Sequence, residues 1–96
     1  MDERIDTFLT DILELEGVSA ASIRDGVRTY LVVYENLVRD TEPDPKNRDA
    51  AARVWRKLCR QKVAEEITNH TGTPLGEFWK LVLSAVDSTG APPTKN

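Results

Sequence analysis

The sequence predicts an all-α fold, either a compact four-helix bundle or an orthogonal array of four helices. Two observations predict it: apolar residues recur at helical spacings in four segments, and glycine or proline separates those segments. The expected helices cover about residues 2–16, 20–40, 45–71 and 74–89. Because the chain has 96 residues, we expect a single helical domain over residues 1–90 and a disordered tail over residues 91–96.

The first two helices are predicted from their apolar stripes and from the residues between them. The first stripe comprises Ile5, Phe8, Leu9, Ile12 and Leu13, and the second comprises Ala20, Ile23, Val27, Tyr30, Tyr34 and Leu37. Gly17 is suited to end the first helix, and Ser19 or Ser22 to cap the second. In isolation VRTYLVVY also fits a strand. A helix is favoured because the stripe is long and Glu35 precedes Arg39 by four residues.

Proline and glycine delimit the other two helices. The stretch DTEPDPK separates the second helix from the third, with Asp44 as cap before Pro45, or Asn47 as a slightly later cap. Gly72 is expected to end the third helix, and Thr73 with Pro74 to begin the fourth. Apolar residues of the fourth helix cover more than half of its circumference: Leu75, Phe78, Trp79, Leu81, Val82, Leu83, Ala85 and Val86. A stripe that wide predicts contact with more than one neighbouring helix.

Composition narrows the class of protein. Hydrophobic residues are 40% and charged residues 30% of the chain, as in globular rather than disordered proteins. No apolar run approaches the roughly 20 residues that a membrane span needs. The N-terminus, MDERIDTFL, is acidic, unlike a secretory signal, and the single cysteine cannot form an internal disulfide. These features predict a cytoplasmic protein.

Charge is distributed unevenly around the net value of −3. Residues 1–16 carry six acids and one base, whereas residues 43–62 carry seven bases and two acids. On a helical wheel of the third helix, four cations gather on the side opposite the apolar face: Arg53, Arg56, Lys57 and Arg60. We call these four residues the basic face. It is expected to be solvated, to pair with acids of the first helix of this chain or a second copy, or to bind an anionic partner, either an acidic protein or nucleic acid.

Catalytic and metal-binding motifs are weak in this sequence. Cys59 falls on the apolar face beside Trp55, which predicts a packed thiol. His70 is eleven residues away, about 16 Å along one straight helix, so the two side chains are not expected to meet. Glu66 and His70 share a face, but a di-iron bundle needs carboxylates from several helices. We therefore expect no enzyme activity, no cofactor, no metal site and no small-molecule substrate.

Three functional hypotheses remain at this stage. The first is a small helical protein-interaction or regulatory module that self-associates as a homodimer, because the apolar stripes are large for a chain of this size. The alternative is a nucleic-acid-binding regulator that uses the basic face. The third, an enzyme using Cys59 and His70, is disfavoured by their spacing. In its general character the chain resembles short all-helical bacterial proteins, a likeness that assigns no site.

Overall fold

A computed structural model describes residues 3–90 of the chain and contains four α-helices and one short 3-10 helix. They are α1 (Glu3–Leu13), α2 (Ala20–Thr41), η1 (Pro45–Asn47), α3 (Arg48–Asn69) and α4 (Pro74–Gly90). The prediction of an all-α fold with four helices is confirmed. The predicted tail over residues 91–96 lies outside the described residues.

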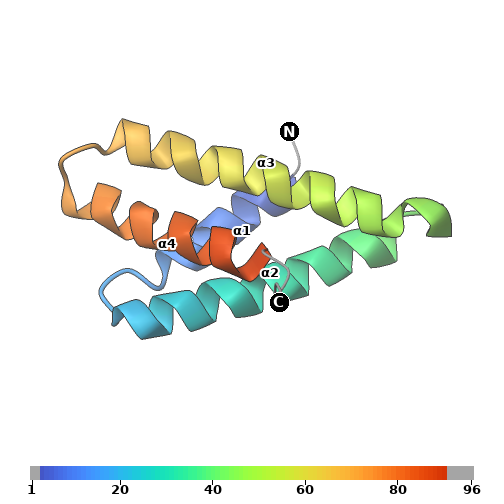
Figure 1. Cartoon of the computed structure of the whole chain (residues 1–96), viewed down its shortest axis with the longest axis horizontal. Coiled ribbons are helices and arrows are strands. Elements are labelled where there is room, and N and C mark those ends of the chain that lie inside the picture. Colours follow the sequence, from blue (N-terminus) through green and yellow to red (C-terminus); the bar gives the residue numbers. More distant parts are fainter. Residues whose placement is uncertain (1–2, 91–96) are drawn as a thin grey trace, which may run out of the picture.

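The helices form two layers. Figure 1 shows α4 between α2 and α3 at one end of the molecule, with α1 crossing behind them. Both α2 and α3 contact α4 and each other, and α1 packs against α2 and α3. The contact of α4 with two neighbouring helices, predicted from its wide apolar stripe, is therefore present. The turns that join α1 to α2 and α3 to α4 lie at the same end of the molecule (Figure 1).

One apolar core is shared by all four helices. An aromatic cluster forms its centre: Tyr34 stacks on Trp55 with ring centroids 5.8 Å apart, and Phe8 meets both rings edge-on. Most of the predicted stripe residues are buried, and the fully buried side chains include Ile12, Val27, Leu31, Val63, Val82 and Trp79. Burial of such side chains stabilises the fold by about 1.5–3 kcal/mol each.

Helix ends follow the predicted capping residues with small shifts. Ser19 caps α2 by accepting from the Ser22 N–H at 3.2 Å. Asp44 accepts from the Lys46 N–H at 3.0 Å, but this cap begins η1, and α3 itself starts at Arg48. The first helix is shorter than predicted: it ends at Leu13, and turns with hydrogen bonds between residues three apart connect it to Gly17, whose φ is 94°.

Candidate functional site

Arg56, one of the four cations of the basic face, is held in an ion pair inside the bundle. Its Nε and Nη2 donate to the two carboxylate oxygens of Glu35 on α2, at 2.6 and 2.8 Å. The two side chains are only 20% and 12% exposed. The hydrogen bond to Glu35 raises the pKa of Arg56 above its usual value, against the opposing effect of burial. This guanidinium is bound in place between α2 and α3.

Arg60 is also paired, while Arg53 and Lys57 remain open. The Arg60 guanidinium donates to both oxygens of Asp87 on α4, at 2.6 and 3.1 Å, and this hydrogen bonding raises the pKa of Arg60. Arg53 and Lys57 are exposed and make no ion pair with any residue between 3 and 90. Two of the four cations are thus neutralised, by acids of α2 and α4 rather than of the expected first helix, which removes much of the support for phosphate binding.

The two residues considered for nucleophilic catalysis lie in different environments. Cys59 is fully buried in the core, as predicted for a packed thiol. His70 follows the C-terminus of α3, where its backbone N–H donates to Glu66 and Ile67 carbonyls and its Nε2 lies 3.8 Å from a Glu66 carboxylate oxygen. Within residues 3–90 no group of three His, Cys, Asp or Glu side chains is placed to hold a metal ion.

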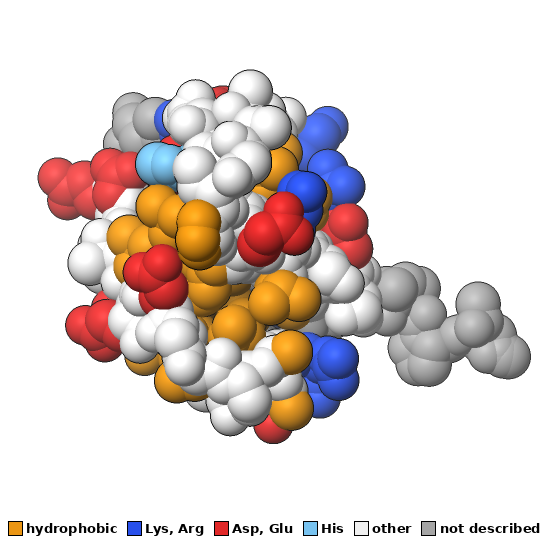
Figure 2. Space-filling model, turned by 90° about the vertical axis from the view of Figure 1, so that its left-hand side faces the viewer, with side chains coloured by type: hydrophobic (Ala, Val, Ile, Leu, Met, Phe, Trp, Pro, Cys, Tyr) orange, Lys and Arg blue, Asp and Glu red, His pale blue; other side chains and the backbone are white. Residues whose placement is uncertain are grey.

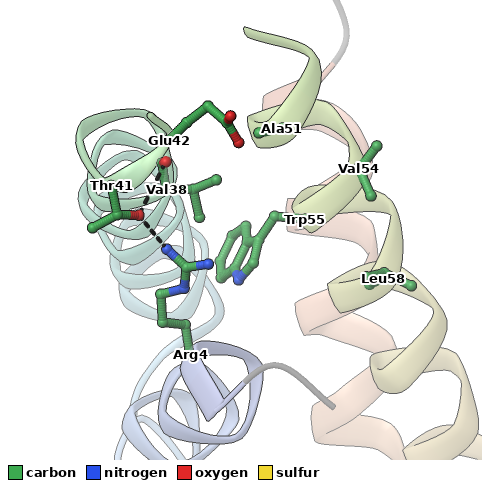
Figure 3. Close-up of a pocket in the computed structure, with 8 residues that line it drawn as sticks. All are labelled: Arg4, Val38, Thr41, Glu42, Ala51, Val54, Trp55 and Leu58. Atoms are coloured by element: carbon green, nitrogen blue, oxygen red, sulfur yellow. Dashed lines mark hydrogen bonds between the residues drawn. The ribbon is translucent and has the colours of Figure 1, made fainter. Parts of the chain in front are cut away.

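A small pocket lies between the start of α1, the end of α2 and the start of α3 (Figure 3). Its volume is about 290 Å³, near the lower limit for small-molecule sites. Arg4 crosses it to donate to the Thr41 hydroxyl at 2.7 Å, and Glu42 lies on the opposite side (Figure 3). Val54 and Leu58 of α3 form its outer wall. The pocket is polar at its centre and apolar at its α3 edge.

A larger apolar groove occupies the end of the molecule that carries the α1–α2 turn. We call it the end groove; it is lined by Glu16, Gly17, Val18, Ile23, Pro74, Glu77, Phe78 and Leu81. Phe78 and Ile23 form a buried floor, whereas Val18 and Leu81 are each 44% exposed. Figure 2 shows apolar side chains gathered on this face, with acidic side chains among them and to their left and basic side chains at the right-hand edge. Its volume is about 560 Å³.

Two acidic residues line the end groove, Glu16 in the α1–α2 turn and Glu77 on α4. Glu16 makes no ion pair within the described part of the chain. On the α4 side, Glu77 is paired with Lys80 at 2.9 Å, but both side chains are more than half exposed. Exposed pairs of this kind are weak and exchange readily with other partners. The groove therefore presents an apolar surface with a negative edge.

The fourth helix creates the groove because its apolar stripe is wider than the surface that its neighbours cover. Trp79, Val82 and Val86 are buried against the bundle, and Leu81 is left on the flank. The sequence predicted the wide stripe but not which residue would be left uncovered. Val18 was not predicted as part of any site, because the packing of the α1–α2 turn beside α4 is a tertiary contact with no local signal.

The comparisons with known proteins add no further constraint. None of the protein-family models, curated proteins or solved structures searched matches this chain. In the part of the chain that the structure describes, no helix is both long and apolar enough to cross a membrane. Functional inference therefore depends on the surfaces described above.

Proposed function

We propose that this protein is a non-enzymatic protein-interaction module, with a regulatory role, and that it binds its partner through the end groove. The observation that carries this proposal is the exposure of Leu81 and Val18 over the apolar floor formed by Phe78 and Ile23. Single exposed apolar side chains are ordinary, but contiguous apolar patches with a polar rim are typical of interaction sites.

Other features support the same proposal. Burial of Cys59 argues against nucleophilic catalysis, because a reactive thiolate needs access to its substrate. The ion pairs of Arg56 and Arg60 leave the basic face with two open cations, fewer than nucleic-acid sites usually use. A single buried cysteine also requires no oxidising compartment, in keeping with a cytoplasmic location.

The proposal is tested by capture of partners on immobilised protein from a lysate of the cells that produce it. Leu81→Lys places a cation in the groove and is compatible with the helix, because Glu77 precedes it by four residues. Ser84→Lys adds the same charge at an exposed position of α4 that does not line the groove. We expect wild type and Ser84→Lys to retain the same proteins and Leu81→Lys to lose them. Identical retention by all three would contradict the proposal.

A further inference from the structure

A second exposed apolar surface lies on α3 and carries the opposite charge to the end groove. Val54 is 58% and Leu58 41% exposed, the former being the highest value among the large hydrophobic side chains of the described residues. Arg53 and Lys57, the two open cations of the basic face, immediately precede them in the sequence. We call these four residues the α3 ridge. The four ridge residues are exposed because the side of α3 that packs into the core carries Trp55 and Cys59 instead.

The end groove and the α3 ridge are both apolar and carry opposite charges. The groove is hollow, apolar and acidic at Glu16, whereas the ridge has two exposed apolar side chains and two cations. Pairing two grooves would bring acids together, and pairing two ridges would bring cations together, both of which are unfavourable. Only groove against ridge joins apolar surfaces while bringing opposite charges together.

One molecule cannot make this contact with itself. The groove lies at the end with the α1–α2 and α3–α4 turns, and the ridge lies on the half of α3 nearer the other end (Figure 1). The long axis of the molecule is 43 Å. The ridge that fits the groove must therefore belong to another molecule.

We propose that a second copy of this chain occupies the end groove and inserts its α3 ridge, so that copies associate head to tail. This inference depends on the proposed function of the groove. Val54 and Leu58 of one copy cover Leu81 and Val18 of the next, while Arg53 and Lys57 approach the acidic rim. Because the interface is heterologous, each bound copy still offers one free groove and one free ridge, and the assembly grows into a ring or a chain. This arrangement differs from the homodimer expected from the sequence, because a head-to-tail contact does not close on two copies.

Because the ridge offers only two large apolar side chains, we expect a small contact and a weak association. Small interfaces are typical of transient complexes, and we expect dissociation constants in roughly the micromolar to millimolar range. Opposite charges at the rim make the affinity decrease as salt is added. Loss of one leucine from such an interface should weaken it about tenfold or more.

Three matched substitutions test the arrangement by sedimentation velocity at increasing protein concentration. Leu81→Gln alters the groove, Leu58→Gln alters the ridge, and Val32→Gln is the control, because Val32 is 49% exposed on α2 and belongs to neither surface. We expect wild type and Val32→Gln to form larger species as concentration rises. Leu81→Gln and Leu58→Gln should each stay monomeric at concentrations about tenfold higher. Circular dichroism checks that all three variants fold.

Mixing the two defective variants gives the decisive result. Leu81→Gln keeps an intact ridge and Leu58→Gln an intact groove, so a 1:1 mixture should form dimers with nearly wild-type affinity and no larger species. A mixture that stays monomeric although each variant is folded would overturn the head-to-tail arrangement.

Wild-type protein that stays monomeric up to roughly millimolar concentration would overturn the proposal that a second copy occupies the end groove. The groove proposal is then judged separately by the capture experiment with Leu81→Lys. Self-association that is lost with Leu81→Gln but unchanged with Leu58→Gln would also overturn the ridge as the inserted surface.

Discussion

Removing Arg56 from its ion pair with Glu35 is expected to destabilise the fold substantially, unlike removing Arg60 from its pair with Asp87. In Arg56→Met the Glu35 carboxylate, which is 12% exposed, loses two hydrogen bonds of 2.6 and 2.8 Å. Removing one partner of a fully buried pair costs about 3–5 kcal/mol, and losing a hydrogen bond to a charged group about 1.5–3 kcal/mol. Because some solvent reaches this pair, we expect the free energy of unfolding to fall by about 2 kcal/mol.

Urea unfolding followed by tryptophan fluorescence measures this difference. Arg60→Met is the matched control, because its pair with Asp87 is about half exposed, and we expect a change near the error of the measurement. Arg56→Met combined with Glu35→Leu should be less destabilised than Arg56→Met alone, since no unpaired carboxylate remains. Equal losses in Arg56→Met and Arg60→Met would refute the reasoning that burial makes the first pair strong.

Three further predictions concern backbone packing, pH and nucleic acid. Gly76→Ala should cost about 1–3 kcal/mol in urea unfolding, because a Cβ there would overlap the His70 carbonyl; Gly26→Ala meets only the flexible end of a leucine and should cost less. Burial and the hydrogen bond to Asp11 raise the pKa of Tyr34 from 10.0 to about 12. The folded state then holds this proton more tightly than the unfolded state, so stability should fall as pH rises from 10.0 to about 12. In Tyr34→Phe the stability should fall less over this pH range than in the wild type. An equal fall in the two proteins would contradict the assignment of this pH dependence to Tyr34. Oligonucleotide binding should be weak, because only two cations of the basic face are open. A plot of the logarithm of the binding constant against the logarithm of the salt concentration should have a slope of magnitude near or below about 2, and a slope of magnitude near about 4 would contradict this prediction.

The helices were predictable because each one carries its signal locally. Apolar spacing of three and four residues predicted the buried faces, and Gly17 and Gly72, which have φ values of 94° and 80°, lie at the predicted breaks. The end of α1 was less predictable, because residues 14–16 continue the apolar and acidic pattern but form turns with hydrogen bonds between residues three apart.

The candidate sites were less predictable because they depend on contacts between helices. A wheel of α3 placed Arg56 and Arg60 among the cations of one face, but it contains no information on Glu35 or Asp87, which lie 21 and 27 residues away in sequence. The end groove was not predicted for the same reason: it depends on how the helices pack. Leu81 was correctly assigned to a wide apolar stripe, and only the packing of α4 shows that it remains exposed.

Amide chemical shifts of the isotopically labelled wild-type protein, recorded from dilute to concentrated solution, test the association between groove and ridge most directly. We expect concentration-dependent shifts in two separate regions: residues 16–18 together with residues 74–81 around the end groove, and residues 53–58 on the α3 ridge. The exposed side of α2 around Val32 should not shift. Shifts confined to one of the two regions, or centred on α2, would contradict the proposal that the groove of one copy receives the ridge of another.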